Sequence, residues 1–104
     1  MKPLRKKMMT KLYITTQYTE NYGDETAPYW KSKGSYDYFV PNVSEGEVES
    51  VMPRARVKIE HSSSFCHEHI IGYRVVPDDF ITRDEEMQME YDGKITFPTV
   101  VVEI

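Results

Sequence analysis

Hydrophobic and polar side chains alternate most clearly in residues 12–18. One face of this two-residue period carries Leu12, Ile14, Thr16 and Tyr18. Alternation among β-branched and aromatic residues is typical of a half-buried strand, so we predict the first strand here. A second strand is predicted over residues 36–40, which are rich in aromatic side chains and are followed by Pro41.

The hydrophobic period disappears between these two strands. Residues 19–35 contain a series of typical turn formers, namely Asn21, Gly23, Asp24, Pro28, Gly34 and Ser35. We therefore predict one long loop. Loops of this length are uncommon in compact domains and are usually functional or disordered. The tyrosines and the tryptophan in this segment predict that the loop packs down onto the domain.

A helical period follows the second strand. Ser44 and Glu47 form an S-x-x-E capping box, and apolar residues then recur at helical spacing as Val48, Val51, Met52, Ala55 and Ile59. This pattern predicts an amphipathic helix over much of 45–61. Pro53 conflicts with it, because proline inside a helix removes a hydrogen bond. Either the helix kinks at Pro53, or Ser50 is the cap and Pro53 lies in the first turn.

The C-terminal third predicts further strands. Residues 69–76 read as a third strand that ends at a Pro-Asp-Asp turn. Residues 82–91 fit two patterns: they open with a second capping box, but Met and Tyr then alternate with polar residues ahead of an Asp-Gly turn. We favour a hairpin over a helix. Its return strand would cover residues 94–97, and the chain would continue extended over 99–104.

Together these elements predict an α+β fold. We expect a mostly antiparallel sheet of four to five strands with one principal helix packed on one face. Residues 1–8 are expected to form a disordered basic arm, because they lack an apolar period and carry four cations: Lys2, Arg5, Lys6 and Lys7. Residues 9–104 then form a single domain of ordinary size.

Composition narrows the classes of protein and of partner. No apolar run approaches the length of a membrane span, and no apolar segment of a signal peptide follows the basic start. The single cysteine, Cys66, fits a reducing compartment, so we expect a cytoplasmic protein without a membrane partner. The formal net charge is −4 although the arm is basic, so the folded body is acidic. That charge disfavours binding to nucleic acids and permits binding to a basic protein.

One cluster of residues resembles a metal site only in composition. It consists of His61, Cys66, His67, Glu68 and His69. The spacing matches no standard zinc motif, and strand alternation places His67 and His69 on the face opposite Glu68. We therefore expect no bound metal and no other cofactor.

Motifs of enzymes are also missing from the sequence. We find no nucleophile elbow, P-loop, dinucleotide fingerprint or H-E-x-x-H helix. A nucleophilic Cys66 would need a histidine base within hydrogen-bonding reach, and neighbours in sequence seldom meet that geometry. We consider an enzyme less well supported than a binding protein.

The best candidate for binding is the aromatic segment 18–33. Aromatic rings alternate there with side chains that donate or accept hydrogen bonds: Tyr18, Glu20, Asn21, Tyr22, Tyr29, Trp30, Lys31 and Lys33. Tyrosine, tryptophan and cationic side chains dominate binding hot spots, so these residues are suited to anchor a partner or to stack on a base. The competing interpretation is that the rings cover one side of a small core.

Three segments of the chain resemble small uncharacterised accessory proteins of tailed bacteriophages. They are residues 11–23, 28–34 and 70–79. The resemblance implies a protein of the host bacterial cytoplasm that binds and modulates a host protein of defence or metabolism. It brings no activity, ligand or site residue with it. The sequence is also compatible with a homodimer. The alternative function is a small-ligand or nucleotide-binding module that uses residues 18–33.

Overall fold

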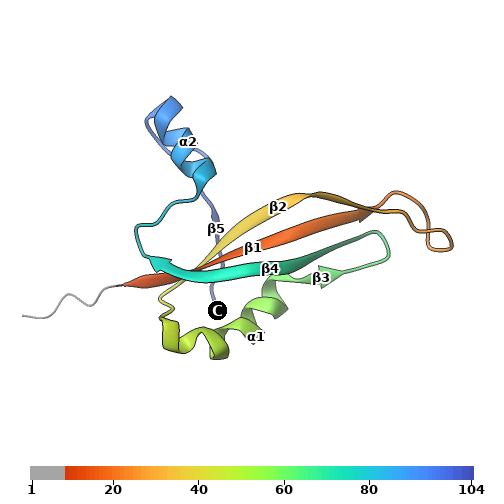
Figure 1. Cartoon of the computed structure of the whole chain (residues 1–104), viewed down its shortest axis with the longest axis horizontal. Coiled ribbons are helices and arrows are strands. Elements are labelled where there is room, and N and C mark those ends of the chain that lie inside the picture. Colours follow the sequence, from red (N-terminus) through yellow and green to blue (C-terminus); the bar gives the residue numbers. More distant parts are fainter. Residues whose placement is uncertain (1–8) are drawn as a thin grey trace, which may run out of the picture.

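A computed structural model describes residues 9–104, and the expected basic arm over residues 1–8 lies outside the described residues. In chain order the elements are β1 (Thr10–Asn21), β2 (Trp30–Pro41), a 3-10 turn (Glu45–Glu47), α1 (Val48–Ile59), β3 (His61–Ser62), β4 (Cys66–Pro77), α2 (Arg83–Asp92) and β5 (Val100–Val101) (Figure 1). The fold is α+β, as predicted.

The five strands form one sheet in the order β3-β4-β1-β2-β5. The central strand β1 pairs antiparallel with both β2 and β4, whereas β5 pairs parallel with β2. The sheet is therefore mixed and is accompanied by two α-helices, which corrects the expectation of one principal helix. A parallel strand needs a crossover connection, and the segment that contains α2 supplies it between β4 and β5.

Strands β1 and β2 form a long hairpin, so the prediction of a loop over residues 19–35 is wrong. The strands pair from Lys11 opposite Pro41 to Asn21 opposite Trp30, and only residues 22–29 connect them. Gly34 has a φ of +135° beside a shift of register in the pairing. Such a bulge hides the strand period in the sequence, because it adds a residue to one strand only.

The core lies between α1 and one face of the sheet. Leu12 and Ile14 of β1 are fully buried, as their two-residue period predicts, and so is Thr16. They pack with Val40 of β2 against the apolar face of α1, which contributes Val51, Met52, Ala55 and Ile59. Burial of the Leu, Ile, Val and Met side chains of this core stabilises the fold by roughly 1.5 to 3 kcal/mol each.

Helix α1 begins at Val48, so the alternative in which Ser50 caps the helix is wrong. The amide and the hydroxyl of Ser44 donate to the Glu47 carboxylate at 3.1 and 2.8 Å, which fixes the 3-10 turn ahead of Val48. Pro53 consequently lies inside α1 and not in its first turn. Packing of the apolar face against β1 offsets the hydrogen bond that Pro53 removes.

Residues 83–92 form helix α2, so the preferred hairpin is wrong. The Thr82 hydroxyl accepts from the amide of Glu85 at 3.2 Å, and the Glu85 carboxylate accepts from the amide of Thr82 at 3.0 Å. Gly93 ends the helix with a φ of +70°, which suits glycine. The return strand over 94–97 is absent from the described structure, and of residues 99–104 only Val100–Val101 are a strand.

The third strand is longer than predicted, and a short partner strand was missed. Strand β4 spans Cys66–Pro77, and β3 pairs His61 with Glu68. Figure 1 shows α1 beneath the sheet and α2 standing away from it. In the described part of the chain, neither helix has the length and the apolar run that crossing a membrane requires.

Candidate functional site

One face of the sheet is left uncovered by α1. It carries the side chains of β1 that alternate with the core residues, and an aromatic contact marks each of its ends. At one end Tyr13 packs against Phe39 and Phe80 with ring centroids 5.6 and 5.3 Å apart. At the other end Trp30 stacks on His67. Antiparallel strands commonly keep one face open in this way, and an open face is available to a partner.

The hairpin end of the sheet exposes four large rings, which we call the distal tip. The exposed fractions are 52% for Tyr22, 64% for Tyr29, 40% for Trp30 and 62% for Phe65. None of them belongs to the buried core. A cluster of large exposed rings at one place on a small domain is typical of a binding surface.

Asn21 holds the backbone of the distal tip in place. Its Oδ1 accepts from the amides of Gly23 at 2.9 Å and Tyr29 at 2.8 Å, while its Nδ2 donates to the carbonyl of Ser64 at 3.0 Å. The backbone amide of Asn21 also donates to the carbonyl of Phe65 at 2.7 Å. The side chain of Asn21 is thus engaged in structure, and it orders both loops that carry the exposed rings.

The loop is tightened further by Asp24 and Gly23. The Asp24 carboxylate accepts from the hydroxyl of Thr26 at 2.7 Å and from the amide of Ala27 at 2.7 Å. The hydrogen bond from the Thr26 side chain, followed by those from the backbone, lowers the pKa of Asp24. A Cβ on Gly23 would lie 2.1 Å from the carbonyl oxygen of Ala27, so only glycine fits there. Local polar contacts therefore fix this loop without using its rings.

The remaining residues of the predicted site fall into two groups. Lys33 lies with the distal tip, where its ammonium is 5.1 Å from the centre of the Tyr22 ring. A hydrogen bond with Tyr22 raises the pKa of Lys33. Tyr18 and Glu20 lie on the opposite face of β1, which they share with Leu12 and Ile14, and Lys31 lies on that face too because it pairs with Glu20. The structure therefore does not bring these three side chains to the Trp30 side.

Tyr18 has contacts of its own on that opposite face. Its ring meets Tyr36 edge-on with centroids 5.8 Å apart. A hydrogen bond with Cys66, together with desolvation, raises the pKa of Tyr18 to about 12. Sequence reasoning missed Phe65 and His67 as members of the site, because only the pairing of β4 with β1 brings these distant residues beside Trp30.

The predicted histidine and cysteine cluster is split between the two faces of β4. Glu68 is buried and accepts from the hydroxyls of Thr16 at 2.5 Å and Tyr38, while His61 lies 3.3 Å away. Burial, followed by the contact with Glu68, raises the pKa of Tyr38. His67 and His69 lie on the other face, as strand alternation predicts.

This division leaves the metal hypothesis without a ligand set. Within residues 9–104, no three His, Cys, Asp or Glu side chains are grouped so that they could hold a metal ion. Glu68 instead satisfies the hydroxyl groups that point into the core from β1 and β2, which is a structural role. We predict that the protein binds no zinc, and elemental analysis tests this prediction.

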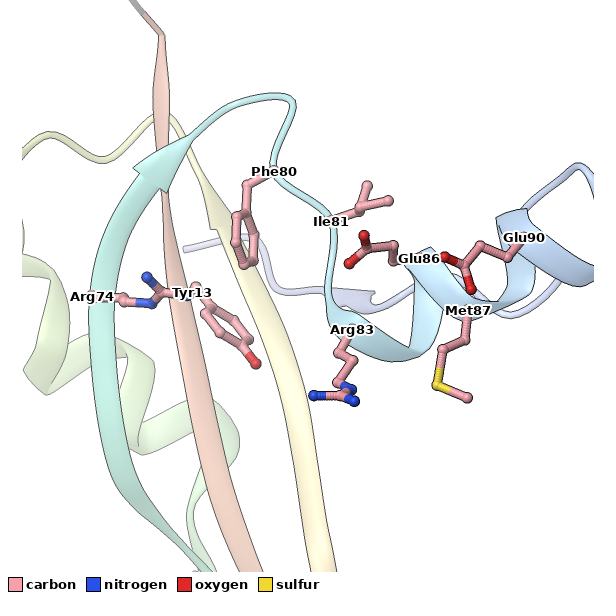
Figure 2. Close-up of a pocket in the computed structure, with 8 residues that line it drawn as sticks. All are labelled: Tyr13, Arg74, Phe80, Ile81, Arg83, Glu86, Met87 and Glu90. Carbon is pink, nitrogen blue, oxygen red and sulfur yellow. The ribbon is translucent and has the colours of Figure 1, made fainter.

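A cleft lies between α2 and the uncovered face of the sheet (Figure 2). It has a volume of about 500 Å³ and is lined by Tyr13, Arg74, Phe80, Ile81, Arg83, Glu86, Met87 and Glu90. The Arg74 guanidinium lies 5.1 Å from the centre of the Phe80 ring and 5.6 Å from that of Tyr13. The cleft thus has an aromatic floor and charged walls, a combination suited to binding a polar group beside an apolar one.

Comparison with known protein families, with curated proteins and with solved structures finds no match to this chain.

Proposed function

We propose that this chain is a non-enzymatic accessory protein of tailed bacteriophages. In this proposal it binds a host protein of defence or metabolism in the bacterial cytoplasm and modulates it. The observation that carries the proposal is the exposure of Tyr22, Tyr29, Trp30 and Phe65 at the distal tip. Their backbone is ordered by Asn21, so little conformational entropy is lost when a partner covers them.

The size of the exposed rings favours a protein as the partner. An aromatic side chain can bury on the order of 150 to 250 Å², and about half of each of these four residues is still exposed, so together they supply a substantial part of one side of a standard interface. Lys33 borders one of these rings, Tyr22, and is exposed. We therefore expect a partner surface that is apolar at its centre and acidic at its rim.

A small-ligand or nucleotide-binding module is the second candidate. One face of the Trp30 indole stacks on His67, and a flat ring would stack on its other face. Trp30 is the single tryptophan, so its fluorescence reports occupancy of this site directly. Saturable quenching by a nucleotide, with no protein captured, would favour this candidate over the first.

The test of protein binding is affinity capture from infected bacteria with the wild-type chain and with Trp30→Ala. One host protein should be captured by the wild type, and Trp30→Ala should weaken its binding about 30-fold or more, as for a hot spot of 2 kcal/mol. Tyr73→Ala is the matched control, because Tyr73 is a half-exposed ring opposite Ile14, on the other face of the sheet. Equal capture by Trp30→Ala would contradict the proposal.

The folding of Trp30→Ala must be measured in parallel. Cooperative unfolding with a midpoint near that of the wild type shows that a loss of capture reflects binding. A loss of about 3 to 5 kcal/mol of stability would identify Trp30 as a core residue and would contradict its role in binding.

A further inference from the structure

The cleft between α2 and the sheet is a second concave surface, separate from the distal tip. Figure 2 shows Tyr13 and Arg74 on the strand side and Glu86, Met87 and Glu90 on the helix side. On α2, Arg83, Glu86, Met87 and Glu90 follow the i, i+3, i+4, i+7 spacing that places side chains on one face of a helix. A full helical face is therefore turned toward the cleft.

The four charged side chains of the cleft are not paired with one another. Among the residues that the structure describes, ion pairs join Arg56 to Glu60 and His61 to Glu68, and neither pair touches the cleft. Glu86 and Glu90 lie one helical turn apart on the same wall, and Arg74 projects from β4 across from them. The strand wall thus carries the cation of Arg74, while the helix wall carries two carboxylates and the cation of Arg83, so the helix wall is negative on balance.

Arg74 is positioned to bind an anion. Its guanidinium rests against the rings of Tyr13 and Phe80, and stacking of this kind leaves the N–H donors in the plane of the group free. Tyr13 is itself held by a hydrogen bond of 3.0 Å from its hydroxyl to Asp37. The ring and the guanidinium therefore form a fixed platform, to which Ile81 and Met87 add apolar surface.

We infer that this cleft binds a short segment of the partner protein that carries a carboxylate, an apolar side chain and a cationic side chain in that order. The carboxylate meets Arg74, the apolar side chain rests on Phe80 and Met87, and the cation meets Glu86 and Glu90. This inference rests on the proposed function, because it describes part of the same partner. The volume of about 500 Å³ lies in the usual range for ligand pockets.

The probe for this inference is the blocked tripeptide Ac-Asp-Leu-Lys-NH2, titrated into the isotope-labelled full chain and followed by NMR. Saturable shifts are expected at Tyr13, Arg74, Phe80 and Glu86. The peptides Ac-Asn-Leu-Lys-NH2 and Ac-Asp-Leu-Gln-NH2 each lack one charge and should bind about tenfold more weakly, since a hydrogen bond to a charged group contributes about 1.5 kcal/mol or more.

Charge reversal provides an independent check. The Arg74→Glu variant should no longer bind Ac-Asp-Leu-Lys-NH2 and should instead bind Ac-Lys-Leu-Lys-NH2. The control Lys58→Glu, on the exposed side of α1, should leave the affinities for both peptides unchanged. If Arg74→Glu does not fold, the three peptides on the wild-type chain still decide the matter. The absence of shifts, or equal affinity for the uncharged Ac-Asn-Leu-Gln-NH2, would overturn the inference.

Two further outcomes separate this site from the alternatives. Trp30→Ala should bind the tripeptide normally, so a failure at the distal tip is distinguishable from a failure at the cleft. Concentration-dependent shifts of the cleft residues without peptide would show that a second copy of the chain fills the cleft, and would overturn the inference.

Discussion

The indole of Trp30 lies stacked on the imidazole of His67, with ring centroids 4.3 Å apart and planes inclined by 22°. The two residues belong to β2 and β4, which are separated by β1, so the stacked pair bridges three strands. The contact orients Trp30 and covers one of its faces while 40% of the residue stays exposed. Trp30 is thus held in position without being part of the core.

Removal of His67 should expose the indole of Trp30 to water. In His67→Ala the face of the indole that His67 covers is open to water, so we expect the fluorescence maximum to shift to longer wavelength. His69→Ala is the control, because His69 lies opposite Gln17, two pairs further from the hairpin end of β1 than His67. An unchanged emission maximum in His67→Ala would contradict the stacked arrangement.

Stability should depend on the core far more than on the distal tip. Leu12 is fully buried, so Leu12→Ala should lower the free energy of unfolding by about 2 to 5 kcal/mol. Tyr29→Ala removes a ring that is 64% exposed and should cost less than about 0.5 kcal/mol. Urea denaturation measures both values, and similar losses would show that the distal tip packs into the fold.

The buried contact between Tyr38 and Glu68 predicts a loss of stability in alkali. Burial, and then Glu68, raises the pKa of Tyr38 in the folded protein above the value of about 10 in the unfolded chain. The folded state therefore keeps a proton that the unfolded state releases, and stability falls as the pH rises above about 10. Tyr38→Phe should weaken this dependence without abolishing it, because the raised pKa of Tyr18 contributes in the same pH range, whereas Tyr29→Phe should leave the dependence unchanged.

The same substitution should also have an effect at neutral pH. Tyr38→Phe removes one hydrogen-bond donor from a buried carboxylate, so we expect a loss of about 1 to 3 kcal/mol. Chemical denaturation at pH 7 measures it. A stability equal to that of the wild type would indicate that water replaces the hydroxyl at Glu68.

Helix α2 should be sensitive to Glu85 and to acid. Burial opposes ionisation of this carboxyl, but hydrogen bonds from Thr82 and Thr99 together outweigh burial and lower the pKa of Glu85. Its contribution to stability is therefore complete above the unfolded value of 4.5 and is lost as the pH falls through the folded value. The amide of Thr99 donates to Glu85 at 2.8 Å, so its protection from hydrogen exchange, relative to an unstructured amide at the same pH, should fall in acid and in Glu85→Ala.

Deletion of residues 1–8 should leave the fold intact. The chain would then begin at Met9, whose carbonyl accepts from the amide of Asp78 at 3.0 Å, and this contact is kept. We expect the free energy of unfolding to change by less than about 1 kcal/mol. A larger loss in denaturant would show that the deleted residues dock on the domain.

Local patterns in the sequence determined those features whose cause is itself local. The two-residue period of Leu12, Ile14 and Thr16 identified β1 and its buried face, because side chains of a strand alternate between its faces. The apolar spacing from Val48 to Ile59 identified α1 for the corresponding reason. These patterns were sufficient for an α+β fold with a helix on one face of a sheet.

The tertiary structure decided the points where local signals conflict or where distant segments meet. Thr82 and Glu85 favoured a helix while the following alternation favoured a hairpin, and the helix prevails because Glu85 and Gln88 also bind the backbone of residues 96–99. Trp30 is separated from Phe65 and His67 by more than thirty residues, and only the strand order β4-β1-β2 unites them. Such contacts depend on which strands pair, and a short window of sequence does not contain that information.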